Sequence, residues 1–284
     1  MGRKARVRWL CGLAGAALSS LSLCGCVDLW EEVTSHDFTV KGLFVTPNPL
    51  VVLRDSNDGD KRAKALLALR EPKRHGGSDK DQEAILQILA RAASNERQPL
   101  CRLAAIESLG QFKDPRAVKG LEDAFYNANN FANLARAGTN PADTFYNAPG
   151  ISPEMPVRIQ CQALAALGET GNPAAVQLLT RVVREPHGEG AEQDRQQVLD
   201  VRMAAARALA KFNQPQATEA LVYVLQNDRD VALRERATES LQASTGKKLP
   251  ADAKAWEAAL NRPGASDVHV ASEGNKKLFG LFGN

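Results

Sequence analysis

The sequence has 284 residues, of which 44% are hydrophobic, 24% charged and only 5% aromatic. This length suits one large domain or two small ones and excludes a disulfide-stabilised miniprotein. The many charges and the scattered apolar residues exclude both a protein with many membrane spans and a wholly disordered chain. The balance towards Ala, Leu and Arg favours helices, because these side chains lose little freedom on entering one.

The formal net charge of +3 comes from the start of the chain. Arg3, Lys4, Arg6 and Arg8 precede an apolar run from Trp9 to Leu23 that holds neither acid nor base. A short basic segment, an apolar stretch and small residues at its end are typical of a secretory signal peptide. Without these four residues, 32 basic residues stand against 33 acidic ones. We therefore expect no nucleic-acid partner.

The apolar run ends in Leu23, Cys24, Gly25 and Cys26. This tetrapeptide resembles the lipobox of bacterial lipoproteins, in which a Leu and two small residues precede the Cys at the cut. The resemblance implies cleavage between Gly25 and Cys26 and a diacylglycerol thioether on Cys26, whose acyl chains anchor the protein to a membrane. Cys24 fits less well, because the residue before it is the large Leu23. An ordinary signal peptide with two incidental cysteines is the alternative.

The residues after Cys26 predict where the protein is sorted. In lipoprotein sorting of two-membrane bacteria, Asp directly after the lipidated Cys favours the inner membrane. Here Val27 takes that position and Asp28 follows it. We therefore expect a lipid-anchored protein of the bacterial cell envelope, with the outer membrane favoured over the inner. Cys101 and Cys161 are expected to be small buried hydrophobic residues, and a disulfide between them is the alternative.

One signature recurs five times along the chain: a basic or polar residue, Ala three positions later and Leu seven positions later. The copies begin at Arg62, Arg102, Gln160, Arg202 and Arg234. Offsets of three and seven place Ala and Leu on one face of a helix, so each copy predicts a helix that buries an Ala/Leu stripe.

A proline follows three of these helices after a short turn, as Pro115, Pro173 and Pro215. Pro is favoured at the first position of a helix, so each of the three predicts the start of another helix. Asp114 and Asn172 precede two of them as predicted N-caps. The repeating unit is therefore a helical hairpin.

The stretch from Arg102 to Val118 includes Ala105, Leu109-Gly110, Asp114-Pro115 and Ala117-Val118. In this pattern it resembles the HEAT repeat family, whose units pair two antiparallel helices. The resemblance covers about residues 47–262. It implies an all-α fold, an α-solenoid of about five HEAT-like helical hairpins with a capping C-terminal helix.

In chain order, the first hairpin is expected at 49–54 and 58–70, and further pairs within 79–110, 115–168, 173–211 and 215–244. A last helix near 251–260 carries Trp256 and is expected to cover the open end of the solenoid. The expected domains are a signal peptide at 1–25, a tether at 26–46, a repeat domain at 47–262 and a disordered tail at 263–284. The repeat domain is expected to hold an insertion at about 125–154.

The sequence holds four histidines as candidates for metal binding or proton transfer: His36, His75, His187 and His269. None has Cys, His or carboxylate neighbours at the spacing of a ligand set, so we expect each at the solvated surface. Iron enzymes built on HEAT-like repeats use His-Glu pairs as ligands, and here no His is followed by Glu. We expect no catalytic residues, no metal and no cofactor.

The arginines that open four of the repeats allow two interpretations. Arg62, Arg102, Arg202 and Arg234 could line a groove and bind an acidic ligand. The interpretation that we favour is structural, because Asp60, Asp200 and Asp230 lie two or four residues before three of them and could hold the turns between helices.

The insertion holds five of the 15 aromatic residues, and they are Phe125, Tyr126, Phe131, Phe145 and Tyr146. Insertions in a repeat fall on one face, and aromatic side chains concentrate the binding energy of interfaces. These five residues are therefore the candidate partner-binding site. The alternative is an insertion that packs its own aromatics onto the solenoid.

Together these features predict a lipid-anchored scaffold or assembly factor that binds a protein partner without catalysis. Two alternatives stay open: an enzyme or enzyme subunit of the HEAT-like lyase kind, and a structural protein that binds cell-wall polymer. The sequence leaves the oligomeric state undetermined.

Overall fold

The computed structural model describes residues 47–128 and 154–261, and all regular structure within these two ranges is helical. The chain divides into two compact units, Met1–Asn48 and Pro49–Asn284, and the description that follows concerns the second. The predicted signal peptide, tether and C-terminal tail lie outside the described residues, as does most of the predicted insertion.

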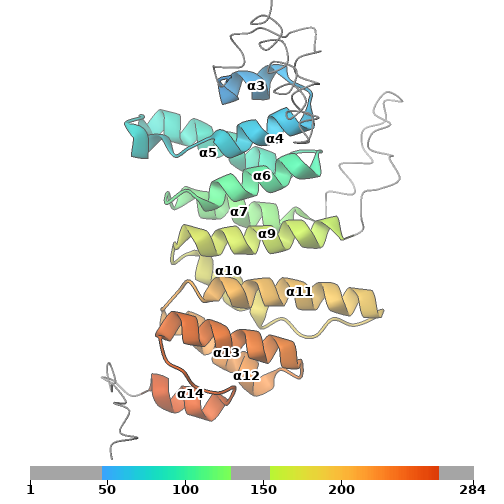
Figure 1. Ribbon diagram of the computed structural model, residues 1–284, viewed down its shortest axis with the longest axis vertical. Coiled ribbons are helices and arrows are strands. Elements are labelled where there is room, and N and C mark those ends of the chain that lie inside the picture. The colour runs from blue at the N-terminus through green and yellow to red at the C-terminus, as the bar shows by residue number, and fades with distance from the viewer. Residues whose placement is uncertain (1–46, 129–153, 262–284) are drawn as a thin grey trace, which may run out of the picture. The chain divides into compact units, whose positions relative to one another are not determined.

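Five helical hairpins follow one another along the chain (Figure 1). They are α3 (Pro49–Asp55) with α4 (Gly59–Ala68), α5 (Asp79–Asn95) with α6 (Pro99–Gly110), α7 (Arg116–Tyr126) with α9 (Met155–Thr170), α10 (Ala175–Val183) with α11 (Glu192–Leu209), and α12 (Pro215–Asn227) with α13 (Val231–Thr245). A short 3₁₀ helix, η3 (Pro72–His75), precedes α5. The expected order and number of hairpins are confirmed.

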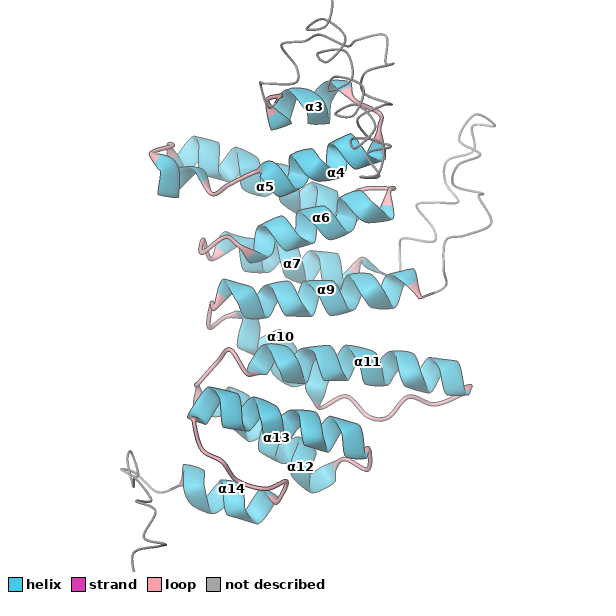
Figure 2. Cartoon of the chain, in the orientation of Figure 1, coloured by secondary structure: helices cyan, strands magenta, loops and turns pink. Residues whose placement is uncertain are grey.

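The hairpins stack so that their helices form two layers, which Figure 2 shows one behind the other. We call the second helices of the hairpins, α4, α6, α9, α11 and α13, the B layer, and each packs against the next. The first helices from the second hairpin onward, α5, α7, α10 and α12, are the A layer. Within it α5 packs on α7 and α10 packs on α12.

The repeated Ala and Leu positions form the core between the layers, as the spacing predicted. Ala105, Ala163, Ala205 and Ala237 are fully buried, and so are Leu109, Leu167, Leu209 and Leu241. Small residues also set the spacing within the B layer. Gly110 on α6 faces Ala166 on α9, so closely that a Cβ on Gly110 would lie 2.9 Å from the Ala166 Cβ.

Helices α7 and α10 begin later than expected, with Pro115 and Ala174 as their N-caps, so the predicted caps Asp114 and Asn172 lie one and two residues before the N-cap. The Asp114 carboxylate accepts from the backbone N–H of Arg116 at 3.0 Å, and the Asn172 side chain accepts from that of Ala174 at 3.0 Å. The first bond satisfies the amide of the first residue of α7, and the second satisfies the amide of the residue that precedes α10. The C-terminal helix α14 (Ala253–Leu260) packs on α12 and buries Trp256 completely, as expected of a cap.

Both cysteines of the repeat region are free thiols, so the disulfide alternative is wrong. Cys101 is buried as expected, and its thiol lies 3.3 Å from the carbonyl oxygen of Gly59. Cys161 is only half-buried, although its side chain packs against the hydrophobic core. Burial and the nearby Asp200 carboxylate raise the pKa of the Cys161 thiol to about 11.

Candidate functional site

The predicted site residues divide into those the structure describes and those it does not. Gly25 and Cys26 lie outside the described residues, as do Phe131, Phe145 and Tyr146. Phe125 and Tyr126 end α7 and are described.

Phe125 and Tyr126 have different surroundings although they are neighbours. Phe125 is 7% exposed and belongs to the hydrophobic core, so it is a packing residue. Tyr126 is 51% exposed, and its ring stands edge-on to that of Phe125, with 5.3 Å between the ring centres. Arg181 of α10 donates a hydrogen bond to the Tyr126 hydroxyl. Of this pair, only Tyr126 stays available to a partner.

For three of the four repeated arginines, Arg62, Arg102 and Arg202, the contacts support the structural interpretation. Arg102 is fully buried and donates to the carbonyl oxygens of Ala93 at 3.0 Å and Asn127 at 3.3 Å. Burial lowers the pKa of Arg102 to about 10, so the side chain is still charged at neutral pH. Arg202 is 3% exposed, donates to the carbonyl oxygen of Val183 at 3.2 Å and forms an ion pair with Asp228.

Arg62 repeats this arrangement nearer the start of the solenoid. It donates to the carbonyl oxygen of Leu53 at 2.8 Å and pairs with Glu96 at 2.6 Å. In all three cases the first bond goes to the last turns of the preceding helix, and the second goes to the residue that caps the C-terminus of the next A-layer helix. Each of these arginines therefore ties two successive hairpins together.

The acids that precede three of these arginines were expected to hold turns and complement helix ends, and two of the three lie at helix starts. Asp230 accepts from the backbone N–H of Leu233 at 2.8 Å and caps α13, while Asp200 accepts from the Gln196 side chain at 2.8 Å. Asp60 is exposed in the first turn of α4. Asp60 and Asp200 do not pair with the arginines that follow them, because Arg62 and Arg202 bind acids of the next hairpin.

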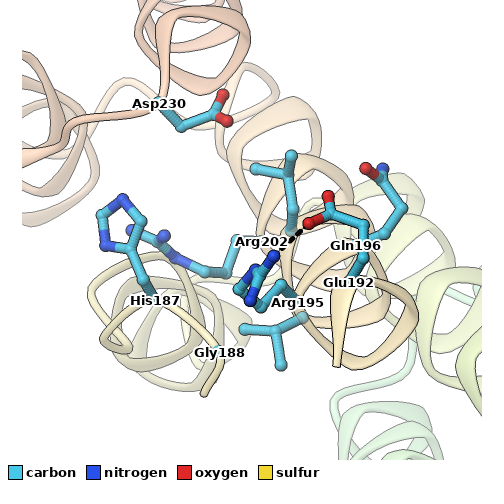
Figure 3. A pocket seen from close by; sticks show the side chains of 9 residues that line it. His187, Gly188, Glu192, Arg195, Gln196, Arg202 and Asp230 are labelled. Carbon is cyan, nitrogen blue, oxygen red and sulfur yellow. Dashed lines mark hydrogen bonds and ion pairs between the residues drawn. The ribbon is translucent and has the colours of Figure 1, made fainter. Parts of the chain in front are cut away.

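A polar pocket of about 210 Å³ lies beside Arg202, between the end of α10, the first half of α11 and the start of α13 (Figure 3). His187 and Gly188 form one wall, and Glu192, Arg195 and Asp230 lie around the opening. The pocket is the one place in the described residues where a histidine joins a buried ion pair.

His187 is exposed, as expected, but it also contacts a buried carboxylate. Its side chain is 47% exposed, but Nε2 lies 3.1 Å from the Asp228 carboxylate, which Arg202 also binds. The Asp228 carboxylate accepts from Arg202 and from the backbone N–H of Asp230 at 2.9 Å, so it has little capacity left to act as a base. No Ser, Thr or Cys lines the pocket. The arrangement can link α10, α11 and α12.

A second hollow, of about 300 Å³, lies on the outer side of the B layer, across α4, α6 and α9. We call it the B-layer groove. Five apolar residues line it, Ala63, Leu67, Leu100, Leu103 and Ala104. Three polar side chains complete the lining, those of Glu107, Arg158 and Gln162. Leu100 is 52% exposed.

Sequence reasoning missed this groove, although the signal was present. In the second repeat Leu100 and Leu103 stand two residues before and one after the repeated Arg102. The fourth repeat has Asp200 and Met203 at the equivalent positions. Leu100 thus stands where the fourth repeat has a charged residue, and an apolar side chain at this position is unusual for a solvated helix face.

Within residues 47–128 and 154–261, no three His, Cys, Asp or Glu side chains gather as a metal-binding group. Over the same ranges, no helix is both long and apolar enough to cross a membrane.

Comparison with known proteins places the repeats in families. The HEAT repeat family matches residues 46–138, and the PBS lyase HEAT-like repeat matches residues 159–185 and 201–227. No curated protein matches the chain. Among solved structures, human deoxyhypusine hydroxylase in complex with glycerol matches at 15% identity and a TM-score of 0.26. That match covers 68% of this chain and 82% of the other, and its low TM-score gives it no weight. The chain thus contains HEAT repeats, and its described residues form an all-helical α-solenoid.

Proposed function

We propose that this chain is a lipid-anchored protein of the bacterial cell envelope whose HEAT-repeat solenoid binds another protein and performs no catalysis. The observation that carries the binding part is the B-layer groove. An apolar floor with a few polar groups at its rim is the usual composition of the centre of a protein interface.

The chemistry of the groove favours an apolar side chain of a partner as its occupant. Leu67, Leu100 and Leu103 supply the apolar contacts, and about 25 cal/mol is gained for each Å² of apolar surface removed from water. Glu107 and Arg158 stand at the same opening with opposite charges, and they favour a partner that carries both signs.

The anchoring part of the proposal is supported by residues 3–26. The basic segment, the apolar run and the lipobox-like Leu23 to Cys26 occur in the order that a lipoprotein signal requires. Envelope localisation, with the outer membrane favoured, follows from the same residues and from Val27 after the candidate anchor.

Photo-crosslinking in cells tests whether the groove binds a protein. A photoreactive amino acid at Leu103 should crosslink one protein in stoichiometric amount, whereas the same amino acid at Ala84, which is exposed on α5 in the A layer, should not. Adding Leu100→Glu to the Leu103 probe should abolish the crosslink, because the carboxylate would lie on the apolar floor. If the Leu103 and Ala84 probes give the same products, the groove is not the binding surface.

A further inference from the structure

Two tyrosines of the A layer each have an arginine against the ring. The Arg181 guanidinium, on α10, lies 5.6 Å from the ring centre of Tyr126 on α7. The Arg184 guanidinium, one turn further along, lies 5.3 Å from the ring centre of Tyr223 on α12. All four side chains are exposed, and three successive helices supply them. We call these four residues the Arg–Tyr strip.

The two arginines of the strip keep their charges unpaired. Among the described residues neither Arg181 nor Arg184 forms an ion pair with an acidic side chain, and the recorded contacts of both are to tyrosine. Stacking on a ring orders a guanidinium but leaves most of its N–H donors free in the plane. The strip therefore presents ordered donors to solvent.

Arg184 also departs from the pattern of the other repeats. It caps the C-terminus of α10, the position that Glu96 takes after α5 and Asp228 takes after α12. Those acids turn inward to Arg62 and Arg202, whereas the fourth hairpin offers a cation in their place.

The fourth hairpin faces α9, and the residue of α9 at the repeated arginine position also departs from the pattern. Gln160 of α9 stands where four of the five repeats have arginine. An arginine there would face Arg184 as a like charge, and Gln avoids this repulsion. The two changes together release Arg184 from the inter-hairpin contact and leave it at the surface over Tyr223.

We propose that the Arg–Tyr strip is a docking surface for an acidic segment of a partner protein. The inference rests on the proposed function in one respect, that the solenoid binds a protein at all. Arg181 and Arg184 lie three residues apart on α10, so two carboxylates spaced along a peptide can each meet one guanidinium. The exposed tyrosines add ring surface on both sides of them.

Acidic neighbours favour a peptide over a continuous polyanion. Glu122 and Glu219 stand one turn before Tyr126 and Tyr223, and Glu185 follows Arg184 directly. A polyphosphate chain or an anionic membrane surface would meet these carboxylates and be repelled. A protein segment can place its own carboxylates at the two arginines and neutral residues elsewhere.

Peptide binding to the full-length chain, purified from membranes in detergent, tests the strip. The probes are fluorescein-labelled short peptides in which Asp or Glu alternates with aromatic residues, each matched by a counterpart with Asn or Gln at every acidic position. Fluorescence anisotropy is measured for the wild type, for the double variant Arg181→Glu/Arg184→Glu, and for Arg207→Glu. Arg207 is an exposed arginine on α11 that forms no ion pair with the other described residues, and it serves as the control.

We expect acidic members to bind the wild type and the Arg207→Glu control equally, and the double variant at least about tenfold more weakly. The amide counterparts should not bind. The inference is overturned if no acidic peptide binds better than its counterpart, or if Arg207→Glu weakens binding as much as the double variant does. It is also overturned if phosphatidylglycerol vesicles bind through Arg181 and Arg184 while the peptides do not.

The two proposals fail separately. A partner crosslinked from Leu103, together with peptides that do not bind, would leave the proposed function standing and remove the strip. If peptides bind through the strip but the Leu103 probe crosslinks no protein, the groove proposal is rejected and the strip proposal stands.

Discussion

At the scale of single residues, the ion pair between Arg202 and Asp228 is buried on both sides, since each side chain is 4% exposed. The equivalent pair, Arg62 with Glu96, is more open, at 23% and 19%. A charge left alone in a buried site loses both its hydration and its partner, whereas one near the surface regains water. The two ion pairs occupy equivalent positions in the repeat, but breaking the buried pair should lower the free energy of unfolding more than breaking the open one.

We therefore expect Asp228→Ala to lower the free energy of unfolding by about 3–5 kcal/mol, because it leaves Arg202 charged and unpaired. Glu96→Ala should lower it by only about 1 kcal/mol, since Arg62 keeps its bond to Leu53 and reaches solvent. Urea denaturation followed by circular dichroism measures both. Equal losses in the two variants would show that burial does not set the difference.

The partners of these arginines could not be predicted from the sequence alone. The arginines themselves recur in register and were found as a repeat. The residues they bind stand 34, 25 and 26 positions further on, for Arg62, Arg102 and Arg202 respectively. The lengths of the intervening helices and turns decide which residue arrives there, and no local pattern contains that information.

At the scale of elements, the B layer depends on close approach between helices that carry small residues. A Cβ added to Gly110 would lie 2.9 Å from the Ala166 Cβ and 3.0 Å from the Ala166 Cα, so the backbone of α9 would have to move. In an open helix, replacing Gly by Ala would gain about 1 kcal/mol. At Gly110 the close contact with Ala166 turns this expected gain in stability into a loss.

We expect Gly110→Ala to destabilise the protein by about 1–3 kcal/mol. Adding Ala166→Gly should recover part of the loss, because it removes the methyl group that the new Cβ meets. Thermal unfolding of the two variants and the wild type measures this. An unchanged or raised melting temperature for the single variant would contradict the close packing of α6 on α9.

The contacts of Asp114 at the start of α7 predict how stability depends on pH. The Asp114 carboxylate accepts from the Arg116 side chain at 2.7 Å and from Gln82 of α5 at 3.1 Å. The Arg116 guanidinium is the main reason that the pKa of Asp114 is lowered to about 2. A carboxylate with a lowered pKa binds fewer protons in the folded state than in the unfolded state, so its contribution to stability is lost as the pH falls.

We expect Asp114→Asn to keep the helix cap but to lower stability by roughly 0.5–1 kcal/mol at neutral pH, where the wild-type carboxylate is charged. The difference from the wild type should shrink between about pH 4 and about pH 2, as the wild-type carboxylate takes up its proton. Melting temperatures measured across this range test the prediction. A difference that stays constant down to the lowest pH would assign no role to the charge.

Elements were the level at which sequence reasoning worked best, because prolines, caps and the Ala/Leu stripe are local signals. The two candidate surfaces escaped it for one common reason. Leu103 and Arg158 become neighbours only when α6 packs on α9, and Arg184 meets Tyr223 only when α10 packs on α12. Both depend on contacts between hairpins, which the pattern within one repeat does not show.

At the scale of the whole molecule, the solenoid offers its two surfaces on different layers. The B-layer groove involves α4, α6 and α9, whereas the Arg–Tyr strip involves α7, α10 and α12 of the A layer. No helix belongs to both surfaces, so one can be altered while the other stays intact. A solenoid transmits a local change mainly to its neighbouring repeats, which makes this separation usable in experiments.

Membrane attachment is the property that a single substitution tests for the molecule as a whole. If Cys26 carries the lipid, Cys26→Ala removes every acyl chain at once, and two or more chains are what hold a protein stably at a bilayer. We expect this variant to leave the membrane fraction, with an unchanged melting temperature for the solenoid. Cys24→Ala is the matched control and should stay with the membrane, because the large Leu23 before it disfavours a cut at that position. If both variants are retained alike, the anchor is not a lipid on Cys26, and attachment must come from another part of the chain or from a partner.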